Sequence, residues 1–185
     1  MGIFCWSLVL FRCPDVLVFK KLNKKEAFEL SKANFGEADY QKELNKFLEE
    51  ESEEFLDKGH GDIWGYHNQD GALVGFGAIC LGHWKIEGGH KKEIVLLYAI
   101  AMKLEFQGKP KIEEKSCKYS NQIMNHLICD AKLRNSENNI LGLLVHPDNG
   151  AAISLYKRFE FQELDRGYID PKTGQAYCRF LRCLG

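Results

Sequence analysis

The stretch LVHPDNGAAISLYKRFEF, residues 144–161, predicts a strand, a turn and a short helix in succession. It includes the end of the apolar run Ile140 to Val145, which is typical of a strand buried on both faces. Asn149 stands where that strand gives way to a helix, so its side chain can cap the first helical turn. Ala152 and Tyr156 follow at helical spacing, which places them on the same helix face as Asn149.

The segments outside this stretch predict one α/β domain with a mixed sheet. Alternation, apolar runs and helical spacing indicate the order β-α-α-β-β-β-α-β-α-β-β. In that order, the predicted elements are a strand at Val16–Phe19, helices carrying Ala27–Ala33 and Tyr40–Phe55, strands at Ile63–His67, Ala72–Phe76 and Ile94–Met102, a helix carrying Ile123–Ala131, a strand at Ile140–Val145, a helix carrying Ala152–Phe159, and strands at Phe161–Ile169 and Ala176–Leu181.

Two local patterns strengthen this assignment. Asn23 and Glu26 have the N-x-x-E spacing of a capping box and predict the start of the first helix. Asp70-Gly71 lies between two β-rich segments and predicts a hairpin. The second of these strands can continue to Cys80, and residues Gly82 to His90 are predicted to form a loop.

Length and composition limit the classes of protein that remain. A chain of 185 residues suits one domain with a real core. Its 45% hydrophobic and 28% charged residues are ordinary for a soluble globular protein. Because the formal net charge is −1, the sequence lacks the basic excess that nucleic-acid binders usually show, and no nucleic-acid partner is expected.

The cysteines indicate a reduced, cytoplasmic protein without a metal site. There are seven of them, an odd number, and none forms a C-x-x-C pair. Such a set favours free thiols over a disulfide framework. No zinc site is predicted, because cysteine and histidine residues do not cluster at ligand spacing.

Residues 1–15 differ from the rest and are predicted to form an apolar arm or an extra strand ahead of a domain at 16–185. The apolar segment Met1 to Phe11 is too short to span a bilayer, and no membrane span is predicted elsewhere. It also lacks the basic start of a signal peptide. An exposed apolar arm could serve homodimer formation or partner binding.

The stretch of residues 144–161 resembles the signature of GNAT acyltransferases. In that family a strand ending V-x-x-x-N leads to A-x-x-x-Y and an exit similar to K-x-G-F, and Asn149, Ala152, Tyr156 and Phe161 fall at this spacing. Glu160 departs from the pattern, because the family usually has glycine there. The resemblance, which extends from about Val16 onward, implies a single GNAT-like domain with a mixed, mostly antiparallel sheet and helices on both faces.

The same resemblance implies an N-acetyltransferase that moves an acetyl group from acetyl-CoA directly to an amine acceptor. Tyr156 would then act as the general acid that protonates the departing CoA thiolate. The structural alternative is a core tyrosine beside Phe159 and Phe161. Two other functions stay open: a non-catalytic acyl-CoA-binding or regulatory protein of the same fold, and an interaction module that has lost the cofactor.

The resemblance also implies a set of residues that bind acetyl-CoA. In the family, pantetheine enters a gap beside the central strand and bonds to its backbone, much as an added strand would. The expected contacts on that strand are Ile100, Ala101 and Met102, and Ala152 and Asn149 lie close to the cofactor on the helix. The pyrophosphate loop is assigned, by counting back from Ile123 and Met124, to Lys115, Ser116, Cys117, Lys118, Tyr119 and Ser120.

Two features depart from the family pattern. One bears on how tightly the cofactor binds, and the other on which residue acts as the general base. Neither this loop nor the alternative alignment at Gln107-Gly108-Lys109 carries the glycines of the family pattern, and Pro110 lacks an N–H donor. Some members of the family carry a glutamate that acts as the general base. The equivalent position in this sequence is occupied by Leu96. Tyr98, on the same strand face, and His83 or Trp84 are candidates to line the acceptor site.

The acidic run Glu49 to Glu54 has two interpretations. The simpler is a solvated outer helix face. The functional alternative is a lip that attracts a cationic substrate. The sequence alone does not identify the acceptor.

Overall fold

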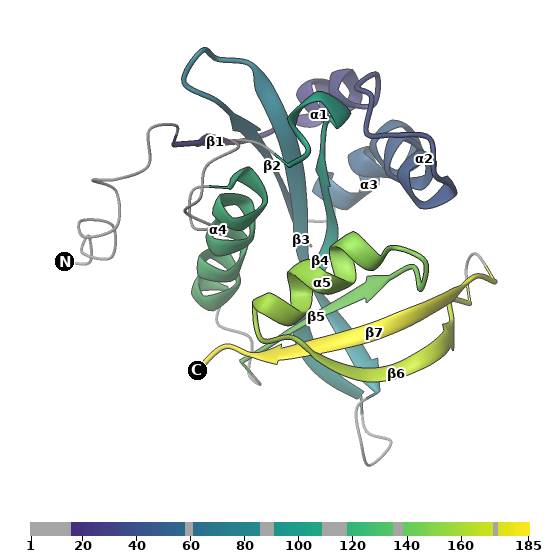
Figure 1. The fold of residues 1–185 in the computed structure, drawn as a ribbon. Coiled ribbons are helices and arrows are strands. Elements are labelled where there is room, and N and C mark those ends of the chain that lie inside the picture. The colour runs from purple at the N-terminus through teal and green to yellow at the C-terminus, as the bar shows by residue number, and fades with distance from the viewer. Residues whose placement is uncertain (1–15, 58–60, 86–90, 109–117, 135–138, 172–173) are drawn as a thin grey trace.

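The computed structural model describes residues 16–57, 61–85, 91–108, 118–134, 139–171 and 174–185. Its helices lie on both faces of a seven-stranded sheet (Figure 1). In chain order the elements are β1 (Val18–Lys21), α1 (Lys24–Leu30), α2 (Asp39–Lys46), the π-helical turn η1 (Phe47–Glu51), α3 (Ser52–Asp57), β2 (Gly61–His67), β3 (Leu73–Lys85), β4 (Lys91–Met102), the 3-10 turn η2 (Leu104–Phe106), α4 (Tyr119–Leu133), β5 (Ile140–Val145), α5 (Gly150–Arg158), β6 (Gln162–Ile169) and β7 (Ala176–Cys183). The predicted arm at 1–15 lies outside the described residues.

The strands follow the order β1-β2-β3-β4-β5-β7-β6 across the sheet. β4 and β5 pair in parallel, and the other five pairings are antiparallel. The sheet is therefore mixed and mostly antiparallel, as predicted. The predicted order of elements is also confirmed when α2, η1 and α3 are taken together as the second helical segment.

Two hydrophobic cores hold the helices to opposite faces of the sheet. One core joins α4 and α5 to one face through Ile123, Leu127 and Tyr156, which pack with residues such as Val95 and Leu143. The other core joins the helices of residues 24–57 to the opposite face, and its members are Leu22, Ala27, Leu30, Phe35, Phe47, Leu48, Ile63, Phe76, Ala78, Ala99 and Ala101. Helices on both faces were predicted and are confirmed.

Short-range sequence signals are reproduced closely. The Asn23 side chain accepts a hydrogen bond from the Glu26 backbone N–H at 3.0 Å, and the Glu26 carboxylate accepts one from the Asn23 N–H at 3.0 Å. These reciprocal bonds form the predicted capping box at the start of α1. Gly71 has a positive φ of 79° in the turn between β2 and β3, which explains glycine at that position.

The second helical segment contains a π-helical turn that the sequence did not predict. α2 runs directly into η1 at Phe47–Glu51, and η1 runs directly into α3. A π-helical turn changes the phase of the side chains that follow it, and such turns occur frequently at functional sites. A prediction based on a uniform period of 3.6 residues cannot detect this change of phase.

Two segments differ from their predictions. β3 continues to Lys85, so Gly82 to Lys85 are strand residues rather than part of a loop, because they pair with residues Lys91–Ile94 of β4. Residues 86–90 of the predicted loop lie outside the described part of the chain. β1 begins at Val18, and Val16 and Leu17 precede it.

No described helix is long and apolar enough to cross a membrane. Within the described residues, no group of three or more His, Cys, Asp or Glu side chains is placed to hold a metal ion. The described cysteines, Cys80, Cys129, Cys178 and Cys183, have free thiols.

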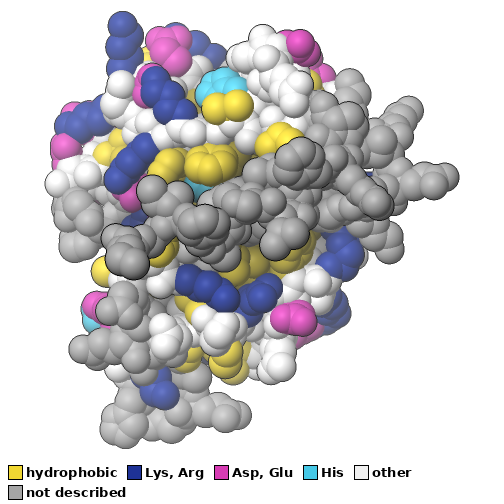
Figure 2. All heavy atoms as spheres, turned by 90° about the vertical axis from the view of Figure 1, so that its left-hand side faces the viewer, with side chains coloured by type: hydrophobic (Ala, Val, Ile, Leu, Met, Phe, Trp, Pro, Cys, Tyr) yellow, Lys and Arg dark blue, Asp and Glu magenta, His cyan; other side chains and the backbone are white. Residues whose placement is uncertain are grey.

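An aromatic cluster joins α4 to β1 and β2. The rings of Phe19 and His126 stand 3.9 Å apart, and Trp64 contacts the same histidine ring. The Tyr66 hydroxyl is hydrogen-bonded to His126 Nδ1 at 2.9 Å, and both side chains are buried. Figure 2 faces the side of the molecule on which α4 and β1 lie, and hydrophobic side chains are visible there among charged ones.

Burial lowers the pKa of His126, with a smaller opposing effect of Asp130. The unfolded chain, in which histidine has a pKa of about 6.5, therefore binds the proton more readily than the folded protein. This histidine favours folding above that pH, and its contribution is lost as the pH falls.

We expect the unfolding free energy to drop between about pH 7.5 and pH 5.5, and to drop less steeply in His126→Gln. Urea denaturation at several pH values measures both slopes. His67→Gln is the comparison, because burial lowers the pKa of His67 as well but leaves that side chain more exposed. An unchanged slope in His126→Gln would contradict the expectation.

Candidate functional site

The site begins where β4 and β5 separate. The two strands pair at only three positions, Val95, Leu96 and Leu97 of β4 with Leu141, Gly142 and Leu143 of β5. Beyond Leu97, β4 stays paired with β3 as far as Met102, and β5 stays paired with β7 as far as Val145. The strands are held on their outer edges and part on their facing edges, which opens a gap in the middle of the sheet.

A β-bulge on β4 lies at the point of separation. Ala99 pairs with Ala78 and Leu97 pairs with Ile79, so Tyr98 is an extra residue with no partner on β3. The alternation of side chains changes there, because Leu97 packs in the α4 core while Ala99 packs in the core on the opposite face. Bulges of this kind commonly re-aim a side chain near an active site.

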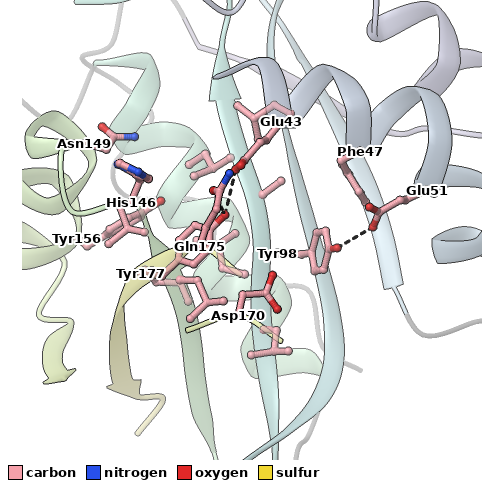
Figure 3. Close-up of a pocket in the computed structure, with 18 of the residues that line it drawn as sticks. Glu43, Phe47, Glu51, Tyr98, His146, Asn149, Tyr156, Asp170, Gln175 and Tyr177 are labelled. Atoms are coloured by element: carbon pink, nitrogen blue, oxygen red, sulfur yellow. Dashed lines mark hydrogen bonds between the residues drawn. The ribbon is translucent and has the colours of Figure 1, made fainter. Parts of the chain in front are cut away.

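A cavity of about 730 Å³ occupies this gap (Figure 3). Its size falls within the range of ordinary ligand pockets, roughly 300–1,000 Å³. The described lining comes from β4 (Leu96–Ile100), β5 and the following loop (Leu143–His146, Asn149), α5 (Tyr156), α2 and η1 (Glu43, Leu44, Lys46, Phe47, Glu51), β3 (Trp84), and β7 with the turn before it (Asp170, Gln175, Tyr177).

Tyr156 is placed at the cavity by the cap of its own helix. The Asn149 side chain accepts a hydrogen bond from the Ala152 N–H at 3.1 Å, which fixes the start of α5 where β5 ends. One further turn along the helix, Tyr156 is only 5% exposed and packs against Phe161 and Phe180. The predicted capping role of Asn149 is confirmed.

The Tyr156 side chain is almost fully buried and lines the cavity, and its hydroxyl has no hydrogen-bond partner among the described residues. Burial raises the pKa of Tyr156 above the ordinary value for tyrosine, which already leaves the phenol neutral at physiological pH. A neutral phenol keeps its proton until negative charge develops beside it. The arrangement can therefore supply a proton to an anion formed in the cavity.

Glu160 holds a backbone conformation that glycine adopts more easily. Its φ is +62°, and the chain leaves α5 through a hydrogen bond from the Phe161 N–H to the Tyr156 carbonyl at 3.1 Å. The departure from the family's glycine therefore changes the residue but keeps the glycine-like turn. The left-handed conformation costs a residue with a Cβ roughly 1–2 kcal/mol.

The opposite side of the cavity combines aromatic rings with a carboxylate. Tyr98 lies against Phe47 and Phe55, with ring centroids 4.8 Å and 5.2 Å apart. Its hydroxyl donates a hydrogen bond to Glu51 at 3.0 Å. Burial, followed by the charge of Glu51, raises the pKa of Tyr98 well above its ordinary value. Glu51 is exposed to solvent and also lines the cavity, so this member of the acidic run is available to a ligand there.

A second polar group lies between these two sides (Figure 3). The Tyr177 hydroxyl donates to the Glu43 carboxylate at 3.0 Å, and it also lies 2.9 Å from the Gln175 side-chain oxygen. Asp170 lines the cavity from the turn that follows β6. Three carboxylates, those of Glu43, Glu51 and Asp170, thus reach one cavity from separate segments of the chain.

The start of α4 is the predicted phosphate-binding region. Lys118 is the N-cap residue, and Tyr119 and Ser120 begin the helix; Lys115, Ser116 and Cys117 lie outside the described residues. The Tyr119 ring is buried in the core, so only its backbone is available to a ligand. Arg158 of α5 donates to the Asn121 side chain at 3.1 Å, which ties this helix start to the helix of Tyr156.

The structure brings several of the predicted site residues together. Ile100, Asn149 and Tyr156 line the cavity, whereas Ala101 and Met102, which follow on β4, are not among its described lining residues. Ala152 packs, partly buried, against the core beneath α5. Of the two candidate acceptor residues on β3, Trp84 lines the cavity and His83 does not.

Sequence reasoning missed Glu43, Asp170, Gln175 and Tyr177. Gln175 and Asp170 lie outside regular elements, and Tyr177 lies on the C-terminal strand. Glu43 is one of many acidic residues at helical spacing, so its pattern matches any solvated helix face. No local pattern sets these residues apart, because they meet only when β7 inserts between β5 and β6.

Comparison with known proteins places the fold. No model of a known protein family matches the sequence, and no curated protein matches it either. Solved structures match over most of the chain. The spermidine/spermine N-acetyltransferase SpeG from Vibrio cholerae, in complex with manganese ions, has a TM-score of 0.59 and 16% identity, covering 91% of this chain and 93% of its own.

Two other matches are similar in extent. A structure described as a putative acetyltransferase of the GNAT family from Desulfovibrio desulfuricans has a TM-score of 0.61 and 12% identity, covering 92% of this chain and 100% of its own. The AtaTR complex bound with acetyl-CoA has a TM-score of 0.59 and 14% identity, covering 90% of this chain and 92% of its own. The chain therefore has the GNAT fold that its sequence predicted.

The unpartnered hydroxyl of Tyr156 leads to a stability prediction. We expect Tyr156→Phe to change the unfolding free energy by less than about 0.5 kcal/mol, because no hydrogen bond to a described residue is lost. Tyr66→Phe is the matched control, since it breaks the buried bond to His126 and should cost about 1–3 kcal/mol. Denaturant titration measures both; a large loss in Tyr156→Phe would indicate a structural role.

Proposed function

We propose that this protein is an N-acetyltransferase that transfers the acetyl group of acetyl-CoA directly to an amine. The observation that carries the proposal is the Tyr156 hydroxyl, which lines a cavity between two parting strands and has no hydrogen-bond partner among the described residues. Proteins of the same fold support it, because SpeG is a spermidine/spermine N-acetyltransferase and the AtaTR complex was solved with acetyl-CoA.

The gap beside β4 suits the pantetheine arm of acetyl-CoA. An extended ligand can hydrogen-bond to the facing edge of β4 beyond Leu97, where β5 no longer pairs with it. We assign Ile100, Ala101 and Met102 to this contact through their backbone groups. Asn149 lines the same gap at the start of α5, the helix that carries Tyr156, and we assign Ala152, in the first turn of that helix, to the cofactor as well.

We assign the phosphates to the start of α4. The first N–H groups of an α-helix have no partner within the helix and attract anions. The backbone of Tyr119 and Ser120 supplies such groups, and Lys118 adds a positive charge beside them. Lys115, Ser116 and Cys117 complete the proposed loop.

The chemistry follows from this placement. The lone pair of the amine attacks the thioester carbonyl carbon, a C–N bond forms, and the C–S bond then breaks. Tyr156 gives its hydroxyl proton to the leaving sulfur, a role open to it because it is a neutral phenol that lines the cavity. The nitrogen loses one proton in the same turnover, so the overall number of protons is conserved.

The cavity also offers groups that can accept the proton of the nitrogen. Glu43 and Asp170 line it between Tyr156 and Tyr98, and either carboxylate can take that proton directly or through a water molecule (Figure 3). Either carboxylate would take the role of the family's glutamate base, whose position is occupied by Leu96.

A second candidate is a non-catalytic acyl-CoA-binding protein of the same fold. The glycine-poor segment Lys115 to Ser120 favours it, because fewer backbone groups can approach the phosphates closely there. Such a protein would differ from an acetyltransferase in one measurable respect. It would bind the cofactor but release no CoA in the presence of any amine.

Acetyl-CoA binding is the first test. A ligand present at about one hundred times its dissociation constant stabilises the native state by roughly 2.7 kcal/mol. We therefore expect acetyl-CoA and CoA to raise the melting temperature and ATP to leave it unchanged. No shift with acetyl-CoA at millimolar concentration would contradict the proposed cofactor site.

The role of Tyr156 is tested separately by kinetics. We expect Tyr156→Phe to lower kcat by about 10²–10⁴-fold, the usual contribution of a general acid, and to leave the dissociation constant of acetyl-CoA nearly unchanged. CoA release measures the first quantity and calorimetry the second. Phe161→Leu, a change in the ring that packs on Tyr156, is the control for altered packing. Unchanged turnover in Tyr156→Phe would exclude the general-acid role.

A further inference from the structure

The cavity has two chemically different sides. Figure 3 shows Tyr156, His146 and Asn149 on one side and Phe47, Glu51 and Tyr98 on the other, with Asp170 and Gln175 between them. The first side carries the group assigned to acetyl transfer. The second side carries a carboxylate and aromatic rings that the transfer reaction does not use.

The charges of the lining differ from those of the whole chain. The chain has a formal net charge of −1, whereas the described lining holds three carboxylates, Glu43, Glu51 and Asp170, and one lysine, Lys46. Lys46 lies 3.7 Å from Glu50, a residue outside the described lining, so its charge is shared with another carboxylate. The cavity is therefore locally acidic.

Glu51 differs from two of its acidic neighbours, Glu50 and Glu53, which are paired with lysines. Glu50 is paired with Lys46, and Glu53 lies 3.3 Å from Lys24. Glu51 forms no salt bridge within the described part of the chain, and its described partner is the neutral hydroxyl of Tyr98. A hydrogen bond from a phenol orients the carboxylate but leaves its negative charge in place, so the charge is available to a ligand.

The aromatic rings beside Glu51 complete a site suited to an organic cation. Tyr98 is 44% exposed, and its ring is supported by Phe47 from η1 and by Phe55 from α3. Aromatic faces attract ammonium groups through their negative electron clouds, and a neighbouring carboxylate adds to that attraction. The π-helical turn and the bulge at Tyr98 together place these groups in the cavity.

The buried Tyr156 hydroxyl is a second and independent sign that the cavity takes a ligand. It is 95% buried by residue exposure, lines the same cavity, and has no hydrogen-bond partner among the described residues. A hydroxyl that lines a cavity and has no partner among the described residues is available to a ligand in that cavity.

We propose that the acceptor is a small aliphatic amine with a second protonated amine, and that Glu51, Tyr98 and Phe47 bind this second ammonium group. The inference rests on the proposed acetyl transfer and adds the chemical class of the acceptor. One amine is acetylated beside Tyr156 while the other is held across the cavity. Glu51 is thus a binding residue, separated from the reacting atoms.

Binding is measured first, because it does not depend on turnover. We expect linear diamines from 1,3-diaminopropane to 1,6-diaminohexane to raise the melting temperature more than the monoamines of equal carbon number at equal ionic strength. Glu51→Gln should weaken diamine binding by about tenfold, in line with the loss of a charged hydrogen-bonding partner. Its effect on monoamine binding should be small.

Glu49→Gln is the matched control. It removes the same charge from the same π-helical turn, two residues away, at an exposed position outside the described cavity lining. We expect it to bind diamines like the unmodified protein. In turnover assays, Glu51→Gln should raise the KM for a diamine and leave kcat nearly unchanged, because the second ammonium group lies away from the reacting atoms.

Two results would overturn the inference: equal stabilisation by diamines and monoamines, or identical diamine binding by Glu51→Gln and Glu49→Gln. The acetyl-CoA titration separates this inference from the proposed function. If the protein binds acetyl-CoA and acetylates monoamines as well as diamines, the proposed function holds and the inference about the acceptor is wrong. If the protein binds diamines through Glu51 but does not bind acetyl-CoA, the proposed function is wrong.

Discussion

The separation of β4 from β5 after Leu97 is the constraint on which the rest of the structure depends. Two parallel strands that pair at only three positions need support from elsewhere, and β3 and β7 provide it on their outer edges. The bulge at Tyr98 changes the alternation of β4 at the same point. The cavity, the exposed strand edge and the position of α5 all follow from this separation.

The two layers of helices have different relations to the cavity. α5 begins directly after β5, so the cap at Asn149 and the helical spacing to Tyr156 place that hydroxyl through local geometry. The helices of residues 39–57 reach the cavity from the opposite face, where the π-helical turn brings Phe47 and Glu51 to Tyr98. One side is therefore defined by neighbouring residues, and the other by packing between distant segments.

This difference explains what the sequence could predict. Three features depend on residues that are close in the sequence, and all three were predicted correctly. They are the capping box at Asn23, the buried strands and the Asn149 to Tyr156 stretch. The extension of β3 to Lys85 was missed because Gly82 to Lys85 have no strand pattern of their own and gain their structure from β4. Glu43, Asp170 and Tyr177 were missed because they meet only through the sheet order β5-β7-β6 and the position of α2 over the sheet, neither of which is a local pattern.

The same distinction bears on how a fold persists while sequences diverge. The contacts proposed for the acyl donor use the backbone of β4 and the first amides of α4, and backbone groups are present whatever the side chains are. Identities of 12–16% across about nine tenths of the chain are compatible with such a site. The proposed acceptor side depends instead on particular side chains, Glu51 and Tyr98 among them. A fold comparison alone therefore cannot identify the acceptor, whereas the charges and rings that line the cavity restrict its chemistry.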